Sequence, residues 1–151
     1  MSRLAMVNLT GVGLLPFATG GLAAHEPRLR VNFGVEEEEM LVRFRLQCAV
    51  ESGADDMLDF GLQLDGALIG GGALFRKGID ITAGKTHDGV SFEWFQKVTK
   101  GSHVVALFTD QVGGASENID TVVAPCTFTV ERVSNDAVLA HGVDSKVAGI
   151  Y

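Results

Sequence analysis

The sequence predicts an all-β protein, a jelly-roll β-sandwich of about eight to nine antiparallel strands. Apolar and polar residues alternate along most of the chain, which is the pattern of strands with one buried face. Turn-forming residues separate these segments roughly every ten residues, a spacing typical of sandwiches and jelly rolls. Glycine is abundant and proline is scarce, 19 against 3 in 151 residues, which favours tight turns and bulges between short strands. We expect an extended N-terminal arm (1–27), the jelly-roll domain (28–133) and a C-terminal tail (134–151).

The N-terminal arm has no sustained period. It contains several glycines, and each glycine inside a helix costs roughly 1 kcal/mol relative to alanine, so we expect no helix there. The arm is nonetheless rich in apolar side chains. We expect it to be disordered in the isolated protein and to become ordered when it is buried against a partner. The residues expected to make that contact are Leu9, Val12, Leu14, Leu15 and Phe17. An early Arg and an apolar middle also resemble a secretory signal, which is the less favoured interpretation.

The strands of the sandwich follow from Arg28 onward. Residues 40–51 show the clearest alternation, with the side chains from Met40 to Val50 on one face and the arginines on the other. Four glutamates at 36–39 interrupt the pattern and predict a solvated loop. Asp65-Gly66 is a hairpin-type turn. The expected strands are 28–33, 40–51, 58–66, 67–75, 78–82, 89–98, 103–110, 119–124 and 126–133.

Residues 91–110 are expected to fold back as a β-hairpin. The turn is Lys100-Gly101-Ser102, and Trp94 lies on the inward face of the first strand. His103 stands next to the turn with no catalytic motif around it, so we expect a structural, hydrogen-bonding histidine and not a catalytic or metal-binding one. The residues that define this structural hairpin are Trp94, Gly101 and His103.

Other chemically versatile residues are isolated along the sequence. The four histidines have no metal-ligand spacing, and no motif for catalysis, phosphate binding or structural zinc occurs, so we expect no catalytic residue, cofactor or metal. Cys48 and Cys126 both face inward, either as buried free thiols, the favoured interpretation, or as a disulfide. The acidic clusters at 36–39 and 55–59 are expected to be solvated, with a calcium or inter-subunit site as the less favoured alternative.

The charge of the chain excludes some partners. A net charge of −7 argues against a nucleic-acid surface, which needs basic residues to displace counterions, and against binding to anionic membranes. No apolar run reaches the length of a transmembrane helix. We therefore expect neither nucleic acid nor membrane as a partner.

The closing part of the chain contains Thr99, Gly101, His103 and Val105 in a T-x-G-x-H-x-V pattern within residues 94–108, followed by the segments 119–123 and 126–133. These segments resemble the closing strands of the C1q/TNF-like jelly rolls of bacteriophage virion proteins. In that family a strand ends in a turn of this type, and an apolar strand follows. The resemblance covers roughly residues 40–133 and leaves the arm and Gly70-Gly71-Gly72 unexplained. It implies a trimeric structural domain without enzymatic activity, and it carries over no catalytic residue.

Two functions follow from these observations. The first is a bacteriophage virion structural protein, a homotrimeric capsid decoration or cement protein that sits on the capsid surface. It would bind the major capsid protein or other virion subunits through its terminal arms. The second is a carbohydrate- or receptor-binding jelly-roll module of a tail or cell-surface protein, which would need exposed aromatic side chains. We expect the chain not to be an enzyme.

Overall fold

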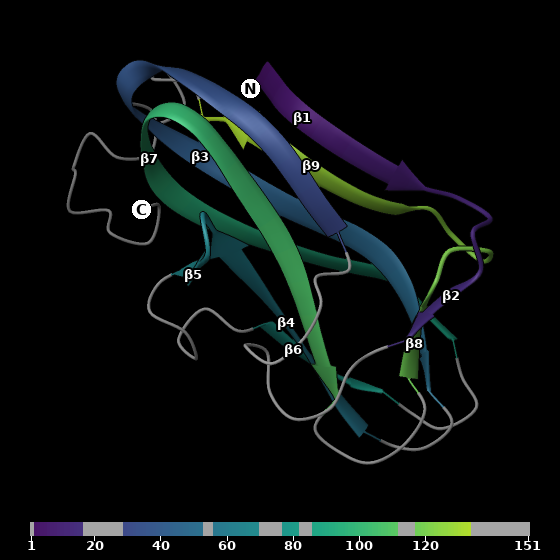
Figure 1. Cartoon of the computed structure of the whole chain (residues 1–151). Helices are drawn as coiled ribbons and strands as arrows, with labels where there is room; N and C mark the ends of the chain where they lie inside the picture. The colour runs from purple at the N-terminus through teal and green to yellow at the C-terminus, as the bar shows by residue number, and fades with distance from the viewer. Residues whose placement is uncertain are drawn as a thin grey trace.

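The computed structural model in Figure 1 describes residues 2–16, 29–52, 56–69, 77–81, 86–111 and 117–133. These residues form nine strands and no helix. The strands are β1 (Ser2–Leu9), β2 (Leu14–Pro16), β3 (Leu29–Ser52), β4 (Asp56–Leu64), β5 (Ala67–Leu68), β6 (Lys77–Ile81), β7 (Thr86–Gln111), β8 (Glu117–Asp120) and β9 (Cys126–Arg132). All pairings are antiparallel in the order β1-β9-β3-β7-β4-β5; in addition β6 pairs with β4, and β8 pairs with β2 and β3. The predicted all-β, jelly-roll-like sandwich is confirmed.

Two long strands build both layers of the sandwich. β3 and β7 pair with each other from Leu29 opposite Leu107 to Glu51 opposite Thr86. Figure 1 shows both strands curving over together, so that their two halves lie in facing layers. One layer contains β1, β9, the second half of β3 and the first half of β7. The other contains the first half of β3, the second half of β7, β4, β5 and β6.

The loop predicted at 36–39 is wrong, because these residues form a bend within the continuous strand β3. All four glutamates are exposed, as expected for solvated side chains, but their backbone remains in β3. The register of β3 against β7 shifts here, from Val35 opposite Gly101 to Glu39 opposite Thr99. Three glutamates therefore oppose one residue of β7, and a bulge of this kind lets a strand bend without leaving the sheet.

The hairpin predicted over residues 91–110 is wrong, because these residues belong to one bent strand, β7. The two halves of residues 91–110 do not pair with each other, because both pair with β3: Trp94 lies opposite Phe44, and His103 lies opposite Phe33. Gly101 stands at the bend with φ of 133°, a conformation that glycine adopts far more easily than other residues.

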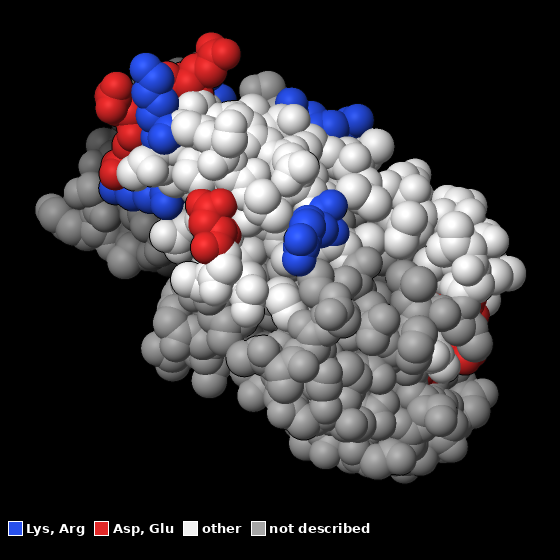
Figure 2. All heavy atoms as spheres, in the orientation of Figure 1, with Lys and Arg blue, Asp and Glu red and all other residues white. Residues whose placement is uncertain are grey.

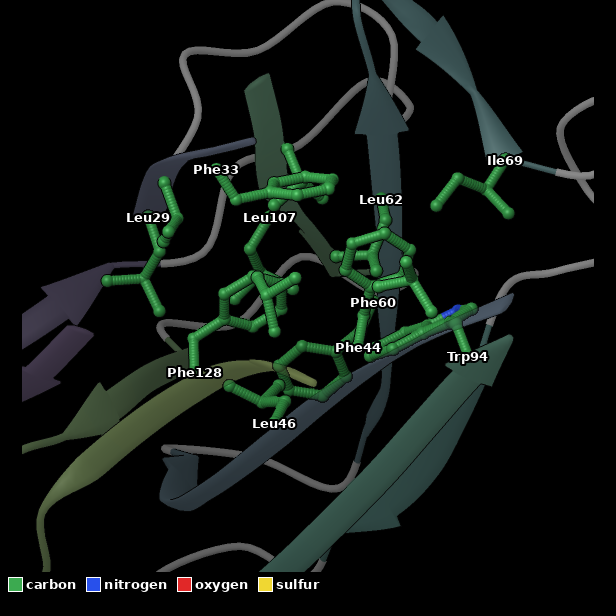
Figure 3. Packing of buried hydrophobic residues seen from close by; sticks show 14 of the residues in the cluster. Leu29, Phe33, Phe44, Leu46, Phe60, Leu62, Ile69, Trp94, Leu107 and Phe128 are labelled. Atoms are coloured by element: carbon green, nitrogen blue, oxygen red, sulfur yellow. The ribbon is translucent and has the colours of Figure 1, made fainter. Parts of the chain in front are cut away.

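The core lies between the two layers and is shown in Figure 3. The predicted inward residues of β3, from Met40 to Val50, are buried there, and Trp94 is only 1% exposed. In the opposite layer the face of β7 toward this core contains Val105 and Leu107, which share the parity of His103. Aromatic rings link the layers, with Phe60 and Phe92 at 5.2 Å between centroids and Phe33 and Phe44 at 5.9 Å.

The N-terminal segment belongs to the sandwich, which corrects the arm prediction for residues 2–16. β1 pairs with β9 from Ser2 opposite Arg132 to Leu9 opposite Cys126, and β2 pairs with β8. The side chains of β1 that pack against the core are Leu4, Ala5, Val7 and Leu9. Gly11 and Gly13, two of the glycines that argued against a helix, lie in the link between β1 and β2, where they do not weaken either strand. Residues 17–28 and the tail 134–151 lie outside the described residues.

Candidate functional site

Two links between strands meet at one end of the sandwich. Residues 10–13 join β1 to β2, and residues 121–125 join β8 to β9. Because β1 pairs with β9 and β2 pairs with β8, the links leave the sheet at the same level and lie side by side. We call residues 10–13 and 121–125 the tip; it lies at the right of Figure 1, where β1 ends and β9 begins.

Thr121 fastens the two links to each other. Its carbonyl accepts a hydrogen bond from the Gly11 N–H at 2.9 Å, and its own N–H donates to the Gly13 carbonyl at 3.3 Å. Its hydroxyl donates to the same carbonyl at 2.7 Å and accepts from the Val12 N–H at 3.1 Å. The threonine itself is fully buried, and its four hydrogen bonds hold the links in one geometry.

Local turn chemistry supports this geometry from both sides. The carboxylate of Asp120 accepts hydrogen bonds from the Val122 and Val123 N–H groups at 2.9 and 3.1 Å, which is the Asx-type arrangement that stabilises turns. Gly11 and Gly13 have φ of 68° and 94°, a region that disfavours side chains. The tip is thus an ordered structure specified by its own residues.

The outer surface of the tip is apolar and uncharged. Val12, Val122 and Val123 are 58%, 69% and 55% exposed, and they are three of the five large hydrophobic residues exposed in the described part of the chain. The tip contains no Lys, Arg, Asp or Glu. Figure 2 shows this end as largely white with some red at its lower margin, while most of the visible positive and negative residues lie at the opposite end, near the bend. Clustered apolar side chains on a rigid surface indicate a contact site for another molecule.

The predicted contact residues are distributed differently from the expectation. Val12 lies in the tip and is exposed, as a contact residue requires. Leu9 instead packs against the core. Leu14 and Leu15 lie in β2, where the structure describes no side chains, and Phe17 lies outside the described residues.

Val122 and Val123 were missed by the sequence analysis, which expected a strand over 119–124. β8 ends at Asp120, and a turn follows. The available signal was the pair of adjacent valines, which breaks the alternation just before Pro125.

The opposite end of the sandwich carries ion pairs around the bend. The glutamates of the bend pair with Lys97, Lys100 and Arg132 at N–O distances of 3.6, 3.9 and 2.5 Å. A cavity of about 370 Å³ lies beside them, lined by Leu4, Gly34, Glu36, Glu37, Met40 and Arg132. Within the described residues, no three His, Cys, Asp or Glu side chains converge on a point where a metal ion would fit. In the same residues, no helix has the length and apolar character needed to cross a membrane.

His103 stabilises the bend of β7 through contacts of both its ring nitrogens. Its Nδ1 lies 2.6 Å from a carboxylate oxygen of Asp65, and its Nε2 lies 2.7 Å from the Thr99 carbonyl, on the other side of Gly101. The second carboxylate oxygen of Asp65 accepts the Val104 N–H at 2.9 Å. The imidazole also lies against Phe33, with ring centroids 5.5 Å apart. These contacts tie together the bend of β7, the β4–β5 turn and β3.

Both neighbours of the His103 ring are hydrogen-bond acceptors. A carbonyl and a carboxylate both need N–H donors, and only the imidazolium offers two. The hydrogen bond to Asp65 raises the pKa of His103, and the Thr99 carbonyl adds to this effect, although burial opposes it. Burial alone would raise the pKa of Asp65, but hydrogen bonds from His103 and Val104 outweigh it, so this pKa lies below its ordinary value.

We expect the contribution of this pair to stability to depend on pH. The raised pKa of His103 stabilises the fold at low pH, and this contribution is lost as pH rises through the folded-state pKa. The lowered pKa of Asp65 stabilises the fold at higher pH, and its contribution is lost as pH falls through its folded-state pKa. Urea unfolding of wild type and His103→Gln should therefore differ most between about pH 4 and 6.5. The difference should be only about 0.2–1 kcal/mol, because Asp65 is half exposed. A difference that grows steadily above pH 7 would contradict this assignment.

Comparisons with known proteins give distant similarity only. The sequence matches no family model and no curated protein. Among solved structures, Eiger TNF from S. frugiperda is similar with a TM-score of 0.46 and 10% identity over 88% of this chain and 94% of that one. A protein of the IBDV viral particle is similar with a TM-score of 0.39 and 14% identity, over 88% of this chain and 36% of that one. A ruminal endo-beta-1,4-mannanase is similar with a TM-score of 0.42 and 14% identity over 82% of this chain. The chain spans only 20% of the length of the mannanase. Carbohydrate-binding modules give similar values. Similarities at this level assign neither a family nor an activity.

Proposed function

We propose that this chain is a virion structural protein, a decoration or cement protein that forms a homotrimer and binds a bacteriophage capsid lattice through its tip. The observation that carries the proposal is the ordered, uncharged cluster of Val12, Val122 and Val123. In this proposal the preformed surface of the tip makes the contact, in place of the terminal arms expected from the sequence. Of the three valines, only Val12 was among the expected contact residues. The trimer comes from the C1q/TNF-like resemblance and is part of the proposal.

The construction of the tip suits attachment to a protein lattice. The central parts of protein interfaces are depleted in charge and are closely packed. A surface already fixed by Thr121 and Asp120 loses little conformational entropy when it binds, so a small apolar area yields more affinity than a flexible arm of the same composition. The charged bend lies at the other end of the sandwich, where it would face solvent and keep decorated particles soluble.

Val122→Asp should reduce binding to capsids by at least about tenfold, because it places a charge in an apolar contact. The measurement is co-sedimentation with capsids assembled from the major capsid protein of the same genome, with the protein at a range of concentrations. Val122 is the most exposed valine of the tip, so the melting temperature should stay within a few degrees of wild type.

Val104→Asp is the matched control, since Val104 is also exposed but lies on β7, away from the tip. It should bind like wild type. Equal binding by wild type and Val122→Asp would remove the tip from the attachment site. Light scattering on the purified protein should give the mass of a trimer, and a monomer at micromolar concentration would contradict the assembly part of the proposal.

The carbohydrate-binding alternative required an exposed aromatic platform. Trp94, the only tryptophan, is buried in the core and does not supply one. Saturable binding to a glycan array that survives Val122→Asp would nevertheless favour that alternative over capsid attachment.

A further inference from the structure

The two cysteines occupy neighbouring positions on adjacent strands. β3 pairs with β9, and the register ends with Gln47 opposite Thr127. In an antiparallel pair, the next position along the two strands is Cys48 beside Cys126. Both side chains are buried in the same core cluster, so both point to the inside of the sandwich. Opposed Cα atoms in such a pair are about 4.5–5.5 Å apart, within the range of about 4.4–6.8 Å that a disulfide spans.

The two thiols are free but already in contact. Their side chains share a hydrogen bond, which raises the pKa of Cys48 together with burial and lowers the pKa of Cys126 against the effect of burial. The hydrogen bond stabilises a thiolate on one of the two sulfurs, and the thiolate is the form that reacts with disulfides.

The pair lies directly below the tip. Cys126 is the first residue of β9, immediately after the link 121–125, and it stands opposite Leu9, the last residue of β1 before the link 10–13. Both links of the tip thus begin or end at this level. Cys126 is fully buried, so a small disulfide reaches it only when the strand ends beside the tip open briefly, and strand ends open more easily than central strands do.

We propose that Cys48 and Cys126 form a redox-responsive dithiol, which closes a cross-strand disulfide with an oxidant of the small-molecule disulfide class and thereby fixes the base of the tip to β3. This goes beyond the proposed function and does not depend on what the tip binds.

The chemistry balances with oxidised glutathione as the oxidant. The Cys126 thiolate attacks one glutathione sulfur, a mixed disulfide forms, and the first glutathione leaves as a thiolate that takes up a proton. Cys48 then loses its proton and attacks the Cys126 sulfur, so the protein disulfide forms and the second glutathione leaves. The two protein thiols lose two electrons and two protons, and both pass to the two glutathione molecules.

The wild-type protein, folded and without denaturant, is the first sample to test. Incubation with oxidised glutathione should remove both titratable thiols, lower the mass by about 2 Da, and raise the melting temperature by roughly 10 °C, because the bond closes a loop of roughly 80 residues. Dithiothreitol should reverse all three changes. Retention of both thiols, or loss of them only in urea, would overturn the proposal.

Single variants test the order of the two steps. Cys48→Ser lacks the resolving thiol and should accumulate one glutathionyl group at Cys126, detected by mass spectrometry of the intact protein. Cys126→Ser should remain largely unmodified over the same time. Equal or faster modification of Cys126→Ser would overturn the assignment of Cys126 as the attacking residue.

The effect on the tip has a separate measurement. Hydrogen exchange of the Val122 and Val123 amides should slow severalfold in the oxidised wild type and stay unchanged in Cys48→Ser under the same conditions. A disulfide that forms without slowing this exchange would overturn the link between the dithiol and the tip. None of these readouts requires a capsid, so failure here is distinguishable from failure of the proposed function.

Discussion

Trp94→Ala should lower the free energy of unfolding by about 3–5 kcal/mol, the usual cost of removing a large aromatic ring from a core. Trp94 is almost completely buried, stands opposite Phe44 in the β3–β7 ladder, and has its ring centroid 6.2 Å from that of Phe92. Typical domains are stable by only about 5–15 kcal/mol, so this loss removes a large share of the total. Urea unfolding should be followed by far-UV circular dichroism, because the variant has no tryptophan left for fluorescence.

The neighbouring residue provides the control for this variant. Phe95 is half-buried and has the opposite parity on β7, so its side chain lies on the outer face of the sheet. Phe95→Ala should cost clearly less than Trp94→Ala, on the order of 1 kcal/mol. Similar losses for the two variants would mean that Trp94 is not buried in the core. Unchanged stability combined with loss of glycan binding would make Trp94 a surface anchor and support the carbohydrate-binding alternative.

Alternation in the sequence was enough to predict which side chains of the strands face the core. Met40, Val42 and Phe44 were assigned to the inside from period alone, and all three are buried. Phe60 and Leu62 follow the same alternation in the expected strand 58–66, and both are buried. This information is local, since each residue of a strand points to the side opposite its neighbour whatever strand lies beside it.

The course of the chain around the bend could not be predicted in the same way. A run of four glutamates is compatible with a solvated loop and equally with an exposed bulge in a continuous strand. Likewise, the turn signal at Gly101 does not reveal whether the flanking segments pair with each other or with a third strand. The outcome depends on β3, which provides partners for both halves of β7.

The candidate site was the least predictable part. Val12 and Val122 are far apart in the sequence, and only the pairing of β1 with β9 and of β2 with β8 brings their links together. The pairing itself was hidden, because the alternation in β1 is weak and its register against β9 shifts between Arg3 and Ala5. Cys48 and Cys126 were correctly assigned to the inside, but their adjacency depends on the β3–β9 register.

Deletion of residues 1–16 should strongly destabilise the sandwich. β1 covers one edge of β9 along its whole length and adds four partly buried side chains to the core, of which those of Leu4, Val7 and Leu9 are the larger. Burial of each of these three is worth about 1–2 kcal/mol, so with the lost ladder bonds the total is at least about 4–6 kcal/mol. For a domain of this size the melting temperature should fall by about 10–20 °C, or the cooperative transition should disappear.

Two point variants separate the packing of β1 from the other effects of the deletion. Val7→Asp puts a charge on the buried face of the intact strand and should reproduce most of the loss in melting temperature. Met6→Ser changes the adjacent, exposed position and should leave the melting temperature within a few degrees of wild type. If the truncated protein melts like the full chain, β1 is dispensable and residues 1–16 act as the arm first expected. If Val7→Asp melts as low as the truncated protein, the stability comes from the apolar face of β1. The N-terminal segment then positions the tip because it belongs to the sheet, and attachment through Val12 depends on the same packing that stabilises the fold.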